Sequence, residues 1–591
     1  MFFTNVKESG LESLLVNWLV NHNGYEQGQN RDYNTEYALD TTRLFRFLKN
    51  TQPDAVKKRQ LEANPQKTAQ LLARVRDEIT KRGIVDVLRK GIKAYPASLI
   101  MFYMTPSVNN PAAAALYAKN IFSVTRQLHF SPDATKLSLD LCIFVNGLPV
   151  ITFELKNQLT KQNVDDAQVK FCTRLQGKES WFLPFNKGYK DGAGNPPNPD
   201  GLMTDYLWKQ VLTKDMLSRI IENYATLVEE KDEETGKTRY KQIFPRYHQL
   251  TAVESLLADV KKNGVGNRYL IQHSAGSGKS NSIAWLAHQL TGLEDAQGNL
   301  LVDSVIVVTD RVVLDKQIRD TIRQFAQTRN IIAWAEHSGD LRKAIEDGRR
   351  IIITTIEKLP YVLPEIGEDH KDRHFAIIID EAHSSQNGKT AGTMNMTLSA
   401  IMSDPDMDNE DKINAMCEGK KLLTNASYFA FTATPKNKTL ETFGTAYEDA
   451  GVIKHRPFHV YTMKQAIQEG FILDVLKYYT PIDSYYRLKK TVEDDLMFDK
   501  KKAQKKLRAF VENQTFTIAQ KADMMVSHFH EQVIAKGKIG GQARAMIITS
   551  SIERCIEYYH AVNKCLANRH SPYKAIIAFS GESSWTRMRL P

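Results

Sequence analysis

Short apolar runs and helix-like segments alternate in the middle of the chain. The apolar runs are YLIQ at 269–272, SVIVVT at 304–309, RIIITT at 350–355, FAIIID at 375–380 and YFAFTAT at 428–434. They are nearly continuous, as is typical of parallel strands that helices cover on both faces. Helix-like patterns stand between them, for example at 278–290 and 314–326. The pattern predicts an α/β domain built on a parallel sheet.

The first part of the chain has a different pattern. It predicts an amphipathic helix over 8–20 and further charged helices over 55–95. Two strand-like runs between 137 and 156 flank Asn146-Gly147, a dipeptide typical of tight β-hairpins. The segment 184–201 is rich in Gly, Pro and Asn and predicts a loop that could act as a tether or lid.

The pattern of apolar strands restarts weakly towards the end of the chain. Strand candidates lie at 543–549 and 574–580. These changes predict a multi-domain α/β protein with one domain over 1–240, whose core spans about 130–175, a second over 241–459 and a third over 460–591.

Composition excludes several classes of protein. The 591 residues are 42% hydrophobic and 25% charged, which is ordinary for a globular protein and excludes wholesale disorder. The net charge of +11 is compatible with a polyanionic partner. The five cysteines are scattered without a Cys-x-x-Cys pair, which argues against a zinc module or disulfide framework and favours the reducing cytoplasm. No apolar run approaches the roughly 18 residues of a membrane span.

A glycine-rich sequence joins the run at 269–272 to the following helix. It reads His273-Ser-Ala-Gly-Ser-Gly-Lys-Ser280, with His273 where the usual pattern has Gly or Ala. Such a loop points backbone N–H groups and a helix N-terminus at phosphates. The residues predicted to bind ATP here are Gly276, Ser277, Gly278, Lys279, which would neutralise the β- and γ-phosphates, and Ser280, which would hold Mg²⁺.

Two carboxylates, Asp380 and Glu381, follow the buried run that ends at 379. The carboxyl end of a parallel strand borders the crevice in which such sheets bind ligands. We expect Asp380 to position Mg²⁺ and Glu381 to polarise the attacking water. Taken alone, the sequence at 273–280 could be an ordinary glycine-rich loop, and the carboxylates could belong to an ordinary acidic loop. The two motifs nevertheless occur in the correct order along the chain, each after its own strand, and together they predict ATP hydrolysis.

Further polar residues follow strands or precede the loop. Each is weak evidence alone, since a threonine at a strand end often only caps it. The candidates are Gln249 for reading adenine, Thr432 and Thr434 for sensing the γ-phosphate, and Arg311, Thr354 and Thr355 for contacting a nucleic-acid backbone.

An acidic pattern precedes this machinery. Asp140 and Glu154 could bind a hard divalent cation, and Lys156 could orient the hydrolytic water. The alternative is an ordinary hairpin with surface charges.

Strand faces alternate with period two, so the three side chains share a face only in one pairing register. The opposite face would then be apolar throughout, formed by Leu139, Leu141, Ile143, Ile151, Phe153 and Leu155. A strict two-residue turn gives the wrong register. We therefore expect a three-residue turn at 145–147 with Gly147 left-handed, or a β-bulge.

Taken together, these motifs resemble those of superfamily 2 helicases and, with the Asp…Glu-x-Lys pattern ahead of them, those of the R (motor and restriction) subunit of type I restriction enzymes. The resemblance rests on Arg246-Tyr-His-Gln249, the loop at 273–280 and Asp380-Glu-Ala-His383, and covers roughly 10–585. It implies a restriction-endonuclease-like core, a RecA-like motor domain and an incomplete second RecA-like domain. The family's nuclease also has a Gln-x-x-x-Tyr element; Gln168 matches its Gln, whereas Cys172 stands in place of its Tyr.

The resemblance implies an ATP-dependent type I deoxyribonuclease that translocates double-stranded DNA and cleaves foreign unmodified DNA with Mg²⁺. It also implies specificity and methylation subunits as partners. The segment 544–554 resembles helicase motif IV and no later motif follows, so we expect an N-terminal piece that binds ATP but hydrolyses it poorly. The alternatives are a DNA-repair helicase and a DNA-binding assembly module with an inactive nuclease domain.

Overall fold

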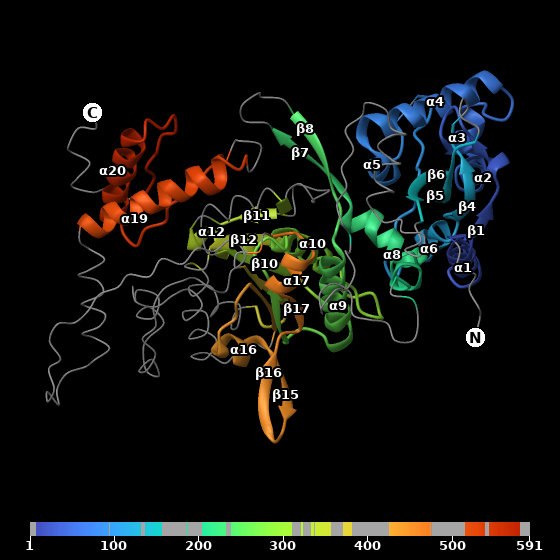
Figure 1. Ribbon diagram of the computed structural model, residues 1–591. Helices are drawn as coiled ribbons and strands as arrows, with labels where there is room; N and C mark the ends of the chain where they lie inside the picture. Colours follow the sequence, from blue (N-terminus) through green and yellow to red (C-terminus); the bar gives the residue numbers. More distant parts are fainter. Residues whose placement is uncertain are drawn as a thin grey trace. The chain divides into compact units, whose positions relative to one another are not determined.

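The computed structural model describes 8–93, 95–131, 136–155, 185, 202, 204–231, 238–309, 321–322, 332–335, 337–355, 358, 370–380, 425–472, 474, 515–537 and 543–579. The chain divides into two compact units, Met1–Asp474 and Val475–Pro591 (Figure 1).

The N-terminal part of the first unit is a four-stranded sheet with helices. Its strands, in the order β1-β4-β5-β6, are β1 (Glu26–Gly28), β4 (Phe122–His129), β5 (Ser138–Val145) and β6 (Leu148–Phe153). β1 pairs parallel with β4, and the other pairs are antiparallel. The helices are α1 (Glu8–Asn21), α2 (Thr41–Thr51), α3 (Pro53–Lys58), α4 (Pro65–Arg82), α5 (Ile84–Lys90) and α6 (Pro111–Tyr117). The helices predicted at 8–20 and over 55–95 are thus confirmed.

Local sequence explains where these helices begin and end. The side chain of Asn64 caps α4 by accepting hydrogen bonds from the backbone N–H groups of Gln66 and Lys67, and Pro65 occupies the first helical position. Gly83 ends α4 with φ +79°, a conformation that glycine adopts without strain.

The motor part of the first unit is a seven-stranded sheet in which every pair is parallel. Its order is β11-β12-β10-β13-β14-β9-β17. The strands are β9 (Arg268–His273), β10 (Ser304–Thr309), β11 (Ile332–Trp334), β12 (Ile351–Thr355), β13 (Phe375–Ile379), β14 (Ala426–Thr432) and β17 (His459–Tyr461). All five predicted strands are confirmed. The edge strands β11 and β17 were not predicted, because three residues are too few to form a recognisable apolar run.

Residues on alternate positions of the motor strands face two different cores. Ile271, Val305 and Val307 belong to one core, whereas Leu270 and Ile306 belong to the other. The described helices around the sheet are α9 (Tyr247–Asn263), α10 (Lys279–Leu290), α12 (Ser338–Glu346), α16 (Asn437–Phe443) and α17 (Met463–Gln468). The sheet is therefore buried on both faces, as its continuous apolar strands require. Of the helix predicted at 314–326, only 321–322 lies within the described residues.

A helical connector joins the two parts of the first unit. It consists of η3 (Leu207–Val211), α8 (Lys214–Arg219) and η4 (Ile220–Tyr224). Leu212 and Ile221 pack in the N-terminal core, whereas Val211 and Ile220 pack in the motor core. Because neighbouring positions enter different cores, the connector is an integral part of both.

Two hairpins of the first unit were not predicted. The charged stretch at 229–241 lies largely within β7 (Thr226–Lys231) and β8 (Thr238–Ile243), and β15 (Thr445–Asp449) pairs with β16 (Val452–Arg456). Their sequences are mostly polar or charged and lack the apolar alternation from which strands were predicted. The predicted border between 459 and 460 falls inside β17.

In the second unit the described elements are helical. They are α19 (Thr515–His528), η8 (Phe529–Ile534) and α20 (Ile552–Asn568), and α19 and α20 share a small core with Ala522 and Val562. The strands predicted at 543–549 and 574–580 are wrong for the residues described there, which form no strand. A strand needs a neighbour for its backbone hydrogen bonds, and none pairs with these segments within the described part. Met546 and Ile576 are accordingly exposed.

No helix in the described ranges is both long and apolar enough to cross a membrane.

Candidate functional site

The glycine-rich loop lies between β9 and α10, as predicted. Gly276 and Gly278 have φ of +73° and +81°, and Gly278 leads directly into α10. The side-chain oxygens of Ser274 and Ser277 are buried without a hydrogen-bond partner among the described residues. A loop of this shape presents N–H groups and spare hydroxyls to an anion, which fits a nucleotide phosphate.

Gln249 holds the loop from the first turn of α9. Its Oε1 accepts a hydrogen bond from the backbone N of Arg246 at 2.9 Å. Its Nε2 donates to the carbonyl oxygens of Ser277 at 3.2 Å and Gly278 at 2.9 Å. A Cβ at position 278 would lie 2.4 Å from that Nε2, so the contact requires glycine. Both ends of the amide are engaged with protein here, and adenine recognition by Gln249 stays a prediction.

The residue that departs from the usual pattern, His273, is completely buried at the end of β9. Its carbonyl oxygen lies 3.5 Å from the Nζ of Lys279, itself 9% exposed. Burial lowers the pKa of His273 well below its ordinary value, with the neighbouring His459 and His248 adding to the effect. Burial likewise lowers the pKa of His248 to about 3 and that of His459 to about 4. All three imidazoles are therefore uncharged at neutral pH.

The other predicted ATP residues end neighbouring strands of the same sheet. Asp380 follows β13 and is 6% exposed, and Thr432 ends β14, which pairs with β9. Thr434 follows two residues later and is exposed. Because the strands are parallel and adjacent, these residues lie at the same sheet edge as the loop. Glu381 lies outside the described residues.

The candidate nucleic-acid residues stand in two different situations. Thr354 and Thr355 end β12 at the same edge and are 1% and 8% exposed. Arg311 lies outside the described residues. Their contact with DNA stays a prediction.

The acidic hairpin has a two-residue turn followed by a bulge. Asn146 and Gly147 have φ of +53° and +83°, and Val145 pairs with Leu148. The register then shifts, so that Ile143 pairs with Ile151. The predicted three-residue turn is wrong, and the predicted alternative, a bulge, is confirmed. Gly147 is left-handed, as was expected for the three-residue turn.

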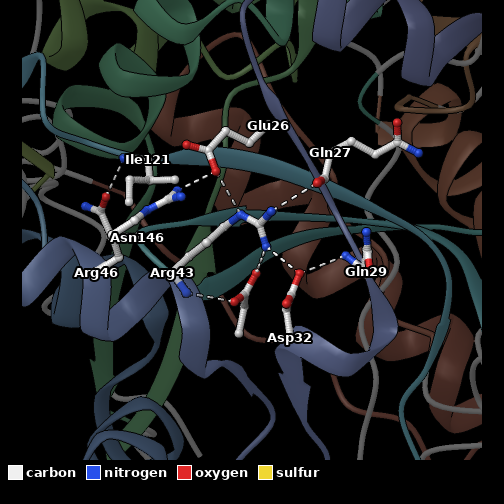
Figure 2. Close-up of polar contacts among 9 residues, drawn as sticks. Glu26, Gln27, Gln29, Asp32, Arg43, Arg46, Ile121 and Asn146 are labelled. Carbon is white, nitrogen blue, oxygen red and sulfur yellow. Dashed lines mark hydrogen bonds and ion pairs between the residues drawn. The ribbon is translucent and has the colours of Figure 1, made fainter. Parts of the chain in front are cut away.

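Tertiary contacts of the buried Asn146 explain why the turn is tight. Its Oδ1 accepts from the backbone N of Ile121 at 2.7 Å, and its Nδ2 donates to the carbonyl oxygen of Met101 at 2.9 Å. Figure 2 shows the contact with Ile121. Asn146 can make both bonds only where the turn places it, so the extra residue is accommodated further along the strand.

The shifted register ends with Leu141 opposite Phe153, and continued by one residue it would set Asp140 opposite Glu154. Both carboxylates are half-buried, and Asp140 Oδ2 accepts a hydrogen bond from the backbone N of Leu155 at 2.5 Å. Two carboxylates are the usual protein contribution to a Mg²⁺ site. Lys156, Gln168 and Cys172 lie outside the described residues, as does the loop at 184–201 apart from Phe185.

The apolar face behind these carboxylates is confirmed except at one end. Leu141 and Ile143 lie in the N-terminal core, with Ile151, Phe153 and Leu155 packed against it. Leu139 instead joins a small cluster with Leu128, Cys142 and Phe144, so the predicted unbroken face is wrong there. Among the described residues no group of three or more His, Cys, Asp or Glu side chains is arranged to hold a metal ion.

A buried arginine, which the sequence did not single out, organises the strands beside the hairpin. Figure 2 shows Arg43 of α2 between Glu26 and Asp32, at 3.2 and 3.1 Å. Arg43 also binds Asp40 at 2.7 Å and donates to the carbonyl oxygen of Gln27 at 3.0 Å. Burial raises the pKa of Asp40 in spite of these bonds. Glu26 and Asp32 are separated from Arg43 by 17 and 11 residues, and no periodicity in the sequence predicts that these charges cluster.

Comparison with known families agrees with the order of the two sites. Residues 5–186 match the family described as type I restriction enzyme R protein N terminus, and 248–509 match the SWI2/SNF2 ATPase family. The N-terminal part of the chain is therefore similar to type I restriction enzyme R proteins, and its motor part is similar to SWI2/SNF2 ATPases. Its multi-domain α/β fold agrees with these matches, as the resemblance of the motifs predicted.

Two curated R-protein relatives illustrate the similarity. The chain is 23% identical to the type I restriction enzyme SsaAORF53P endonuclease subunit of Staphylococcus saprophyticus, over 78% of this chain and 46% of that protein. It is 24% identical to the HindI endonuclease subunit of Haemophilus influenzae, over 76% and 43%. The chain thus spans less than half the length of these relatives. A solved structure, a fragment of a putative HsdR subunit of a type I restriction enzyme from Vibrio vulnificus, also matches. The match covers 61% of this chain and 60% of that fragment, with 14% identity and a TM-score of 0.31.

Proposed function

We propose that this chain is the motor and nuclease part of a type I restriction enzyme. It uses ATP to translocate double-stranded DNA and cleaves foreign, unmodified DNA with Mg²⁺. The observation that carries the proposal is that one chain combines a glycine-rich loop at the carboxyl edge of a parallel sheet with an upstream bulged hairpin, whose paired strands end next to Asp140 and Glu154.

In the motor, the chain's own residues bind and orient the nucleotide. The N–H groups at 276–280 and Lys279 hold the phosphates, while Ser280 and Asp380 hold Mg²⁺, which when bound neutralises charge on the β- and γ-phosphates. Glu381 orients the attacking water. The threonines of β14 (Thr432) and just beyond it (Thr434) border the same site.

In the nuclease, Asp140 and Glu154 would hold Mg²⁺, which would supply positive charge to the phosphate that is cleaved. Lys156 orients the water and stabilises the charge of the transition state, and Gln168 completes the site. The bond between Asp140 and the backbone N of Leu155 fixes one carboxylate where β6 ends.

The remaining parts of the proposal concern organisation and partners. Arg311, Thr354 and Thr355 contact the DNA backbone, and specificity and methylation subunits complete a cytoplasmic assembly. We place the nuclease domain at 1–240 and the motor domain from 241, and we extend the latter to 474, where the first unit ends. The rest belongs to a second motor domain.

The test of the motor is nucleotide binding by the 591-residue chain. Titration with MgATP should show binding that Lys279→Ala weakens by at least about 100-fold, because the lysine supplies the charge opposite the phosphates. Lys262→Ala removes the same charge from the exposed end of α9 and should bind like the parent. Equal binding by both variants contradicts the assignment of the loop.

The test of the nuclease uses the complete enzyme assembled with its other subunits. Asp140→Ala should abolish DNA cleavage while ATP consumption continues. Persistent cleavage with unchanged ATP use would contradict the nuclease assignment and favour a DNA-repair helicase or an assembly module.

A further inference from the structure

We propose that residues 458–472 are a positioning element for the glycine-rich loop at 273–280, here called the phosphate loop. His459 and Tyr461 are the residues through which this element holds the loop in place. The inference rests on the proposed nucleotide binding. It concerns residues that belong to none of the sequence motifs above.

The element first extends the sheet up to the loop. β17 pairs parallel with β9, with His459 opposite Ile271 and Tyr461 opposite His273. The carbonyl oxygen of Tyr461 accepts a hydrogen bond from the backbone N of Ser274 at 2.9 Å. Ser274 is the first residue after β9, so the start of the loop is tied to β17.

A chain of imidazoles makes the second connection. Nε2 of His273 lies 2.9 Å from Nδ1 of His459, and Nε2 of His459 lies 3.3 Å from Oγ1 of Thr251. That hydroxyl donates to the carbonyl oxygen of Tyr247 at 2.9 Å.

The protons of this chain have one favourable arrangement. His273 donates to His459, His459 donates to Thr251, and Thr251 donates onward. The reverse order would require the Thr251 hydroxyl, whose hydrogen already goes to the carbonyl oxygen of Tyr247, to donate to His459 instead. His459 therefore serves His273 as an acceptor.

Tyr461 makes the third connection through His248. The two rings stack with centroids 3.7 Å apart and planes 7° apart. Nε2 of His248 lies 3.1 Å from the carbonyl oxygen of Ser277, and since a carbonyl only accepts, this nitrogen carries the proton. The phenol of Tyr461 donates to Glu469 at 2.7 Å, which fixes the ring that His248 lies on.

The end of the element closes over the loop's glycine. The centroid of the Phe471 ring lies 3.7 Å from the guanidinium carbon of Arg246. Nη1 of the same guanidinium donates to the carbonyl oxygen of Gly276 at 3.4 Å. A Cβ at position 276 would lie 2.7 Å from Cγ2 of Ile472. The element thus constrains the loop near Ser274, Gly276 and Ser277.

These contacts couple the element to whatever the loop binds. Because coupling is reciprocal, a nucleotide that orders the loop also stabilises residues 459–472 without touching them.

The experiment compares two substitutions at position 459 in the 591-residue chain. His459→Leu removes the acceptor for His273 and should weaken MgADP binding by about 5- to 10-fold in calorimetric titration. His459→Asn places an amide oxygen where Nδ1 stood and should bind within about twofold of the parent. His374→Leu, at an exposed histidine, is the matched control. Tyr461→Ala should resemble His459→Leu, because it removes the ring on which His248 stacks.

Hydrogen exchange provides a readout that a purely structural role would not move. In the parent chain, MgADP should slow exchange of the backbone amides at 459–472, and His459→Leu should remove that protection. Parental affinity in His459→Leu, equal losses in His459→Leu and His459→Asn, or absent protection in the parent each overturn the inference. If the parent chain binds no nucleotide at all, the proposed function fails instead.

Discussion

The phosphate loop and the acidic hairpin are held in place in different ways. The loop joins the buried strand β9 to the helix α10. Side chains from α9 and from the segment after β16 contact the loop and support it. The hairpin lies at the edge of a mixed sheet, where a bulge sets the register of its strands. A strand–loop–helix unit in a parallel sheet brings its functional residues together through their adjacency in the chain, and tertiary contacts then hold them, whereas a hairpin brings its functional residues together only through strand pairing.

The largest expected effects separate the two sites chemically. In the complete enzyme, Lys279→Ala and Asp140→Ala should each reduce DNA cleavage by at least about 100-fold, the first by removing motion and the second by removing a metal ligand. Only Lys279→Ala should also abolish ATP consumption. Measuring both activities on both variants tests the separation, which fails if Asp140→Ala stops ATP use too.

A large loss of stability is expected beside the hairpin. Arg43→Met leaves the nearly buried Asp40 without its counter-ion, which should cost about 3–5 kcal/mol in the free energy of unfolding of this region. Arg46→Met removes an exposed partner of Glu26 and should cost no more than about 1 kcal/mol. Urea unfolding followed by hydrogen exchange in α2 measures the loss of unfolding free energy in each variant. Similar losses in Arg43→Met and Arg46→Met would contradict the central role of Arg43.

A smaller effect should distinguish strain from contact in the phosphate loop. Gly278→Ala and Gly264→Ala both place a side chain at positive φ, but only the first meets another atom, Nε2 of Gln249. Both should cost about 1 kcal/mol of stability for the backbone conformation. Gly278→Ala should in addition lower MgATP affinity about tenfold, because it displaces the amide that holds the loop carbonyls. Equal affinities would show that Gln249 does not position the loop.

A further effect concerns pH and arises in the motor part. His248, His273 and His459 are uncharged when folded, with pKa values lowered by burial, to about 3 for His248 and about 4 for His459. In the unfolded chain they titrate near 6.5, so below that pH the unfolded state binds more protons and stability falls as pH drops.

The expected loss between pH 7.5 and 5.5 is about 1 kcal/mol per histidine. Thermal unfolding at both pH values measures it, and His459→Asn should show a smaller pH dependence than the parent.

Much of the motor and part of the hairpin could be predicted from sequence. The five apolar runs became parallel strands because a strand buried on both faces must be apolar throughout, and this pattern is local. The loop around Gly276 and Gly278 was located for the same reason, since its glycines and Lys279 are adjacent in the chain. For the hairpin, alternation showed that Asp140 and Glu154 could share a face but left open how the turn would allow it.

Long-range contacts decided the rest. Asn146 keeps a tight turn because its amide bonds to Ile121 and Met101, which moves the extra residue into a bulge. His273 stands where the usual loop pattern has Gly or Ala. Its burial there is tolerated because His459, 186 residues away, forms a hydrogen bond with its Nε2. Such pairings depend on which surfaces meet when the chain folds, and a sequence read along its length shows periodicity and adjacency but not those meetings.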